Sequence, residues 1–320
     1  MPFAVCIVTN QTHYDEKRRI AMKQKKWIRT AVAAAAALTL AVSLTACGSN
    51  GGNGGASASD NDNGGAEQTS TGRTVEQIQD SGKIVIGVFS DKAPFGYVDS
   101  NGDYQGYDVY FGNRIAEDLG VDVEYVPVDP ASRVEYVATG KVDIILANFT
   151  VTEERAQQVD FALPYMKVAL GVVSPDGAEI TDVSQLDGKT LIVCKGTTAE
   201  TYFEENCPNV TLQKYDQYAD AYNALLDGRG DAFSTDNTEV LAWALNNPGF
   251  TVGVTSLGDL DTIAPAVQQG NTSLLNWLND EIKSLGEENF FHADYAETLA
   301  PVYGESANPD DLVVESGVVE

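Results

Sequence analysis

Short apolar runs alternate with amphipathic segments along the chain from about residue 82 onward. The run at 83–89 is typical of a buried strand, and apolar residues then recur every four positions from Tyr107 to Leu119, as on one helix face. Further strands are expected at 121–128, 142–147, 189–194, 210–215, 231–236 and 250–254, and further helices at 132–140, 197–206, 218–228, 237–247 and 273–291. This alternation predicts an α/β fold with mostly parallel sheets.

The alternation of strands and helices occurs twice along the chain, which predicts two lobes with a ligand cleft between them. In open α/β sheets, ligands bind beyond the carboxyl ends of the strands. We expect the lobes and tail to divide as follows: lobe 1 at 73–168 and 260–310, lobe 2 at 169–259, and a C-terminal tail at 311–320.

The segment 1–46 has the layout of an export leader. Basic residues precede an apolar stretch from Ala31 to Leu44, which is shorter than the roughly 20 residues that span a bilayer. The sequence "LTAC" then resembles the lipobox of bacterial lipoproteins, which predicts a lipid on Cys47. The alternative is a plain secreted protein with a chance cysteine. Translation starting at Met22 would give a better leader.

Residues 47–72 are rich in Gly, Ser and Asn, which predicts a flexible tether. Of 20 basic residues seven precede Cys47, but only two of 47 acidic residues do, so the net charge from there on is −32. Nucleic acid and anionic lipid are poor partners for so acidic a surface.

Few residues could support catalysis or bind a metal. Cys194 and Cys207 lie at opposite ends of a predicted helix, too far apart for a disulfide, so we expect free thiols. His292, in the aromatic sequence "NFFHADY", is the one histidine after the leader, and packing is its simplest role. We therefore predict no enzyme activity, no cofactor and no metal.

The segment "DIILANFTVTEERAQQVDF" (143–161) leaves a strand through polar residues and then places an arginine in a first helical turn. Thr152 is a good N-cap, and the acids after it suit the helix dipole. Arg155 together with the backbone N–H groups of this turn predicts a carboxylate site. The alternative is a surface pair between Arg155 and a local acid.

Several motifs, in order, resemble signatures of the family-3 extracellular solute-binding proteins, the amino-acid receptors of bacterial ABC importers. They are "GYDVYFGNRIAEDLG", "GKVDIILANFTVTEERAQQVDFALPYMKVALGVV", "KGTTAETYF" and "GRGDAFSTDN". The resemblance covers about residues 82–305 and is closest to the cysteine-binding members; the aspartate/glutamate-binding members are less similar. It implies the two-lobe, type II periplasmic-binding-protein fold.

The resemblance also implies roles for single residues. Arg155 would hold the ligand's α-carboxylate with Thr150, and Asp236 would accept from the α-ammonium. The following residues would complete the clamp: the main chain of Asn148 near the ammonium, and Gly196, Thr197 and Thr198 at the start of a helix facing the carboxylate.

Four residues bear on selectivity. Arg133 matches an arginine that aspartate/glutamate binders aim at the side-chain carboxylate, and cysteine binders carry it too; the alternative is a surface salt bridge to a nearby acid. Cys194 stands where cysteine binders have asparagine. Lys92 and Phe95 would lie at the pocket rim, where a lysine disfavours cationic ligands.

The predicted function is an extracytoplasmic receptor that captures a small polar amino acid and delivers it to an ABC permease with its ATPase. L-cysteine is the favoured ligand, with aspartate, glutamate or cystine as alternatives and an exported dehydratase as a remote one. The protein would act as a monomer on the outer face of the cell membrane, held there by a lipid on Cys47.

Overall fold

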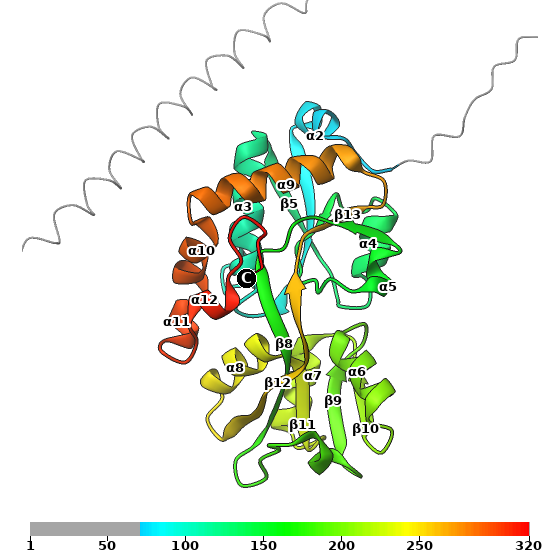
Figure 1. The fold of residues 1–320 in the computed structure, drawn as a ribbon, viewed down its shortest axis with the longest axis vertical. Helices are drawn as coiled ribbons and strands as arrows, with labels where there is room; N and C mark the ends of the chain where they lie inside the picture. The colour runs from blue at the N-terminus through cyan, green and yellow to red at the C-terminus, as the bar shows by residue number, and fades with distance from the viewer. Residues whose placement is uncertain (1–70, 320) are drawn as a thin grey trace, which may run out of the picture. The chain divides into compact units, whose positions relative to one another are not determined.

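The computed structural model describes residues 71–319. The predicted leader, nearly all of the predicted tether and Cys47 lie outside these residues. The described chain contains two five-stranded sheets with helices packed around them (Figure 1). The predicted α/β class with two lobes is confirmed.

The first lobe is built on a sheet with the strand order β5-β1-β6-β13-β7. Its strands are β1 (Lys83–Val88), β5 (Asp122–Pro127), β6 (Ile144–Ile145), β7 (Val159–Phe161) and β13 (Ala266–Gln268), with a separate small sheet of β2 (Asp91–Lys92), β3 (Gly96–Val98) and β4 (Tyr104–Gln105). Its helices are α2 (Val75–Ser81), α3 (Tyr107–Leu119), α4 (Arg133–Ala138), α5 (Glu153–Ala156), α9 (Thr272–Glu287), α10 (Phe290–Thr298), α11 (Ala300–Tyr303) and α12 (Pro309–Leu312).

The second lobe is built on a sheet with the strand order β10-β9-β11-β8-β12. Its strands are β8 (Met166–Pro175), β9 (Thr190–Cys194), β10 (Thr211–Tyr215), β11 (Ala232–Asp236) and β12 (Phe250–Ile263). Its helices are α6 (Thr198–Asn206), α7 (Tyr218–Leu226), α8 (Asn237–Asn246) and the 3-10 turn η1 (Val183–Leu186).

Both sheets are mixed rather than mostly parallel. In each sheet three neighbouring strands run parallel, and two further pairings are antiparallel. The expectation of mostly parallel sheets was wrong because it rested on strand-helix alternation, whereas β8, β12 and β13 depart from it. The strand β8 follows β7 with no helix between them, and β13 follows β12 in the same way.

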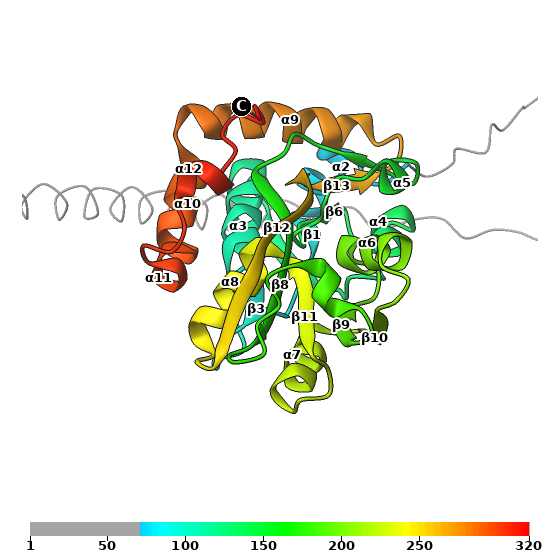
Figure 2. The same cartoon turned by 60° about the horizontal axis from the view of Figure 1, so that its bottom comes forward.

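The chain passes between the lobes in β8 and β12, which lie side by side along their length (Figures 1 and 2). Their pairing runs from Pro175 opposite Phe250 to Met166 opposite Ile263. The register shifts three times along it, so the pair is irregular where it joins the lobes. The boundaries expected at 168/169 and 259/260 fall inside these two strands.

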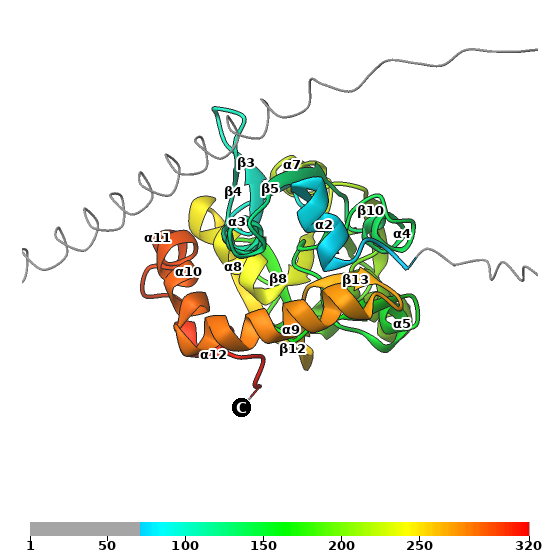
Figure 3. The same ribbon diagram turned by 90° about the horizontal axis from the view of Figure 1, so that it is seen from above.

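The helix α3 shows how the sequence pattern sets the core of the first lobe. Its residues Tyr107, Phe111, Ile115 and Leu119 are all buried, as the four-residue spacing predicts, and the helix packs against β1, β5 and α10. Burying each such side chain contributes roughly 1.5–3 kcal/mol. The predicted helix at 273–291 is instead two helices, because Asn289 adopts a left-handed backbone with φ 54° between α9 and α10. Figure 3 shows α9 lying next to α2.

The last described residues pack on the first lobe. Val313 forms a β-bridge with Met166, and the Val314 amide donates to the Tyr165 carbonyl at 3.1 Å. His292 is polar in its contacts and not simply packed: its ring nitrogens lie 2.9 Å from Glu315 and 3.1 Å from Asp310. No helix within residues 71–319 combines the length and hydrophobicity needed to cross a bilayer.

Candidate functional site

The polar segment that follows β6 is held in an unusual backbone conformation. Asn148 has φ 44°, in the left-handed region, and its backbone N–H donates to Asp108 Oδ2 at 2.8 Å. Asp108 lies in the first turn of α3 and also accepts from the Tyr165 hydroxyl at 2.5 Å. Burial raises the pKa of Asp108 to about 6, although these hydrogen bonds favour the ionised form. Asp108 therefore fixes the segment that carries Asn148 and Thr150.

Arg155 extends from α5 toward the second lobe. Thr152 is the N-cap, as predicted, and its side chain accepts from the Arg155 amide at 3.2 Å. The guanidinium donates to the Thr150 carbonyl at 2.7 Å and to the Gly196 carbonyl at 2.9 Å. It thus binds two carbonyls rather than a local acid, which contradicts the surface-pair alternative. Burial lowers the pKa of Arg155 to about 9, and the nearby Arg133 contributes to this.

The sequence predicted that the dipole of the helix at Arg155 would help to bind a carboxylate, but in the structure this contribution is small. The helix α5 has four residues, about one turn, so few peptide dipoles are aligned behind Arg155. The positive charge of the site comes from the guanidinium itself.

Arg133 is a buried residue, only 3% exposed, so the alternative of a surface salt bridge is wrong. Its guanidinium carbon lies 5.4 Å from the Phe89 ring centre and 4.7 Å from that of Phe149. Its donors bind four backbone carbonyls, those of Pro130, Ala147, Asn148 and Gly196, at 3.0–3.2 Å. Burial lowers its pKa. Arg133 therefore connects the segments that form the site from both lobes.

The second lobe contributes the turn between β9 and α6. Thr197 is the N-cap of α6: its hydroxyl accepts from the Glu200 amide at 3.2 Å and donates to the Cys194 carbonyl at 2.7 Å. Gly196 has φ 72°, and a Cβ there would lie 2.6 Å from Ala131 Cα of the first lobe. Only glycine lets the two lobes approach this closely.

Lys92 and Phe95 are fully buried, so the prediction that they lie at the pocket rim was wrong. Both belong to the turn around β2, which packs against the second lobe: the Ala219 amide of α7 donates to Asp91 Oδ2 at 3.0 Å. The Lys92 ammonium is 4.6 Å from the Tyr218 ring centre and 5.5 Å from that of Phe95. Lys92 and Phe95 lie in a short loop flanked by apolar residues, and nothing in that sequence indicated that the second lobe would cover it.

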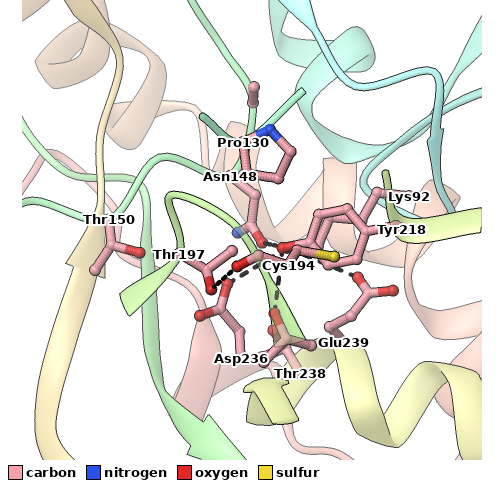
Figure 4. Close-up of polar contacts among 12 residues, drawn as sticks. Lys92, Pro130, Asn148, Thr150, Cys194, Thr197, Tyr218, Asp236, Thr238 and Glu239 are labelled. Atoms are coloured by element: carbon pink, nitrogen blue, oxygen red, sulfur yellow. Dashed lines mark hydrogen bonds and ion pairs between the residues drawn. The ribbon is translucent and has the colours of Figure 1, made fainter. Parts of the chain in front are cut away.

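Asp236 ends β11 and takes the N-cap position of α8, and it is 6% exposed. Lys92 Nζ lies 3.5 Å from Asp236 Oδ2 and also donates to Asn148 Oδ1 (Figure 4). Burial opposes the charge of Lys92, but Tyr218, Asp236 and Glu239 outweigh it and raise the pKa of the lysine. Cys194 is buried in the same core cluster as Phe89 and Tyr218, and burial raises the pKa of its thiol.

The sequence analysis did not name Glu239 and Tyr218, which lie beside Lys92 in the second lobe, or Tyr222, whose hydroxyl donates to Glu239. Glu239 is fully buried, and burial raises its pKa to about 7 against the lowering effects of Lys92 and the Tyr222 hydroxyl. A usable signal was present: Asp236 ends the strand expected at 231–236 and Glu239 lies in the first turn of the helix expected at 237–247, so the two carboxylates are expected to lie near each other.

A pocket of about 820 Å³ opens between α5 of the first lobe and α6 of the second. Its lining includes Pro130, Phe149, Arg155, Gly196 and Thr198, together with glutamates and amide side chains of the two helices. Arg155 therefore lines this pocket, whereas Asp236 and Lys92 are not among its lining residues. Asp236 is near enough to Arg155 to favour its charged form.

The arrangement suits a molecule that carries both charges. Arg155 can pair with a carboxylate, and Asp236 can accept from an ammonium, each from a different lobe. Within the described residues, no group of three or more His, Cys, Asp or Glu is arranged to hold a metal ion. Cys194 and Cys207 are free thiols.

Residues 84–296 match the bacterial extracellular solute-binding proteins, family 3. The chain belongs to this family. A curated relative, the ABC transporter glutamine-binding protein GlnH of Bacillus subtilis, is 29% identical over 72% of this chain and 86% of its own length. The L-cystine-binding protein TcyJ of Escherichia coli is 25% identical over 68% of this chain and 83% of its own.

Two solved structures are more similar to this solute-binding protein in sequence. A solute receptor for L-cysteine of Neisseria gonorrhoeae is 53% identical, with a TM-score of 0.75, over 76% of this chain and all of that chain. The cysteine-binding protein of Campylobacter jejuni is 50% identical, with a TM-score of 0.74, over 75% of this chain and 98% of that chain. The relatives and neighbours named here are binding proteins.

Proposed function

We propose that this chain is the substrate receptor of an ABC importer and that its ligand is a small polar amino acid, L-cysteine. Family membership supports binding of an amino acid outside the cytoplasm. The two cysteine-binding neighbours, at 53% and 50% identity, support the choice of ligand.

The observation that carries the proposal is that Arg155 and Asp236 come from opposite lobes and lie near enough for Asp236 to favour the charged form of Arg155. In this proposal Arg155 binds the α-carboxylate with the Thr150 backbone and with the turn at Gly196, Thr197 and Thr198. Asp236 binds the α-ammonium near Asn148. A zwitterion bound in this way contacts both lobes, so it stabilises the closed arrangement through contacts that the open one lacks.

The site offers little to a cationic side chain. In this proposal Lys92, Arg133 and Arg155 all face the ligand, and like charges brought together at low dielectric repel. A thiol is small and uncharged at neutral pH, and beside buried cations it can also ionise. In this proposal Arg133 and Lys92 face the side chain of the ligand, with Cys194 and Phe95 among the residues behind it.

The proposed partners are an ABC permease with its ATPase, and the membrane through a lipid on Cys47. The lipid would keep the receptor at the outer face of the membrane, and residues 47–72 would give it reach. The acidic surface disfavours nucleic acid, and the protein would act as a monomer.

The proposal is tested by thermal unfolding of the purified protein with each of the twenty amino acids and cystine. A ligand at a hundred times its Kd stabilises by about 2.7 kcal/mol through mass action. We expect L-cysteine to give the largest rise in Tm. A larger rise with aspartate, glutamate or cystine would overturn the choice of cysteine, and no rise with any of them would contradict amino-acid binding.

A further inference from the structure

One lysine and two carboxylates form a buried cluster between the lobes. Lys92 comes from β2 of the first lobe, while Asp236 and Glu239 come from the end of β11 and from α8 (Figure 4). Lys92 Nζ lies 3.5 Å from Asp236 Oδ2 and 3.9 Å from Glu239 Oε2. Lys92 is 1% exposed and Glu239 0%. Each charge in this cluster must therefore be balanced inside the protein.

The two oxygens of Glu239 have different surroundings. Oε1 accepts from the Tyr222 hydroxyl, whereas Oε2 has no hydrogen-bond partner within residues 71–319 and lies nearest to Lys92. The titratable groups that face Glu239 come from several elements: Asp91 and Lys92 of β2, Cys194 of β9, Tyr218 and Tyr222 of α7, Asp236 at the end of β11, and Tyr303 of α11. Lys92 is the one cation among these groups.

We propose that Glu239 is a positioning residue for ligand capture: its carboxylate balances Lys92, so that Asp236 remains able to bind the ligand's α-ammonium. This inference rests on the proposed function. Glu239 itself touches no ligand; it acts through Lys92.

The reason is the charge balance of the cluster. With Glu239 neutral, Asp236 is the one remaining carboxylate within 4 Å of Lys92 Nζ among residues 71–319, and an arriving ammonium adds a second cation to it. With Glu239 ionised, two carboxylates face two cations. Binding of the ammonium therefore favours the ionised form of Glu239, and the ionised form favours binding.

Because Glu239 must be ionised to balance Lys92, affinity for the ligand should depend on pH. Since burial raises the pKa of Glu239 to about 7, the residue is partly protonated at neutral pH. Ligand binding should then release part of a proton, so affinity should rise as pH increases from about 6 to 7.5. The slope should disappear when Glu239 cannot ionise.

The test is a calorimetric double-mutant cycle on the full protein, titrated with L-cysteine under reducing conditions. At pH 7.5, Glu239→Gln should weaken binding at least tenfold and flatten the dependence on pH. In the Lys92→Met background, where no cation needs balancing, the same Glu239→Gln change should alter affinity less than threefold. Equal effects of Glu239→Gln in both backgrounds would overturn the inference.

Asp294→Asn is the matched control, because Asp294 is also a fully buried carboxyl with a raised pKa but lies in α10, where it accepts from Thr298. Its affinity should stay within twofold of wild type. Should Glu239→Gln not fold, Tyr222→Phe decides: loss of the donated hydroxyl should move the midpoint of the affinity profile to higher pH, and an unmoved midpoint overturns the inference. A wild-type protein that binds no amino acid contradicts the proposed function itself, whereas normal binding in Glu239→Gln contradicts this inference alone.

Discussion

The substitution Gly196→Ala should affect two properties that can be measured separately: the stability of the second lobe and the closing of the two lobes around a ligand. Gly196 has φ 72°, so any L-residue there is strained by roughly 1–2 kcal/mol whether the lobes are together or apart. The added methyl would also lie 2.6 Å from Ala131 Cα and 2.9 Å from Ala131 N, across the cleft. This second conflict exists only when the lobes are closed.

The expected loss of ligand affinity follows from the overlap between the added methyl group and the backbone of Ala131. Ala131 presents backbone atoms that cannot rotate away, and overpacking of this kind costs typically 1–3 kcal/mol. Because 1.4 kcal/mol is a factor of ten, ligand affinity should fall about 5- to 150-fold. Any loss of the hydrogen bonds from Arg133 and Arg155 to the Gly196 carbonyl would add to this.

Gly188→Ala is the matched control. Gly188 has φ 75° in the same lobe, but a Cβ there would meet nothing within 4 Å. Both variants should lose similar stability in thermal unfolding without ligand, and only Gly196→Ala should lose affinity in calorimetry. Wild-type affinity in Gly196→Ala, or equal loss in the two variants, would refute the argument that closure brings Gly196 against Ala131.

Three further predictions concern the clamp, the core and the anchor. Arg155→Ala and Asp236→Ala should each weaken ligand binding by about 2–5 kcal/mol in calorimetry, because one end of the zwitterion loses its partner, while Arg229→Ala at an exposed pair should not. For Asp108 the folded pKa of about 6 exceeds the unfolded value of about 3.9, so its stabilisation is present below the unfolded pKa and is lost as pH rises through 6. Denaturant unfolding should therefore show Asp108→Asn gaining about 2 kcal/mol relative to wild type between pH 4 and 7. Cys47→Ala should abolish lipid attachment, and mass spectrometry finding an unmodified N-terminus in wild type would contradict the lipoprotein prediction.

The elements that the sequence predicted well are those whose local signals agree. The helix α3 has a regular apolar face, and α5 begins at the N-cap Thr152, so spacing and capping located both. The arrangement of β8 and β12 could not be predicted in this way. Their pairing joins residues that are far apart in the chain, and periodicity carries no information about which strands meet.

The residues of the candidate site also fall into those that the sequence could indicate and those that it could not. Arg155, Thr150 and Asp236 follow strand ends, where a ligand cleft is expected, and they could be named from the motifs. Burial of Lys92 could not, because it depends on α7 and α8 of the other lobe covering β2. Once Lys92 is buried, a carboxylate such as Glu239 is needed nearby, which is a consequence of tertiary packing.

The central claim is that the cleft binds one amino-acid zwitterion, that of L-cysteine, between Arg155 and Asp236. Calorimetric titration of the wild-type protein with L-cysteine, L-aspartate, L-glutamate, L-glutamine and L-cystine tests it most directly. We expect one site per chain, the highest affinity for L-cysteine, and loss of that heat signal in Asp236→Ala. Tighter binding of another of these amino acids, or undiminished L-cysteine binding in Asp236→Ala, would contradict it.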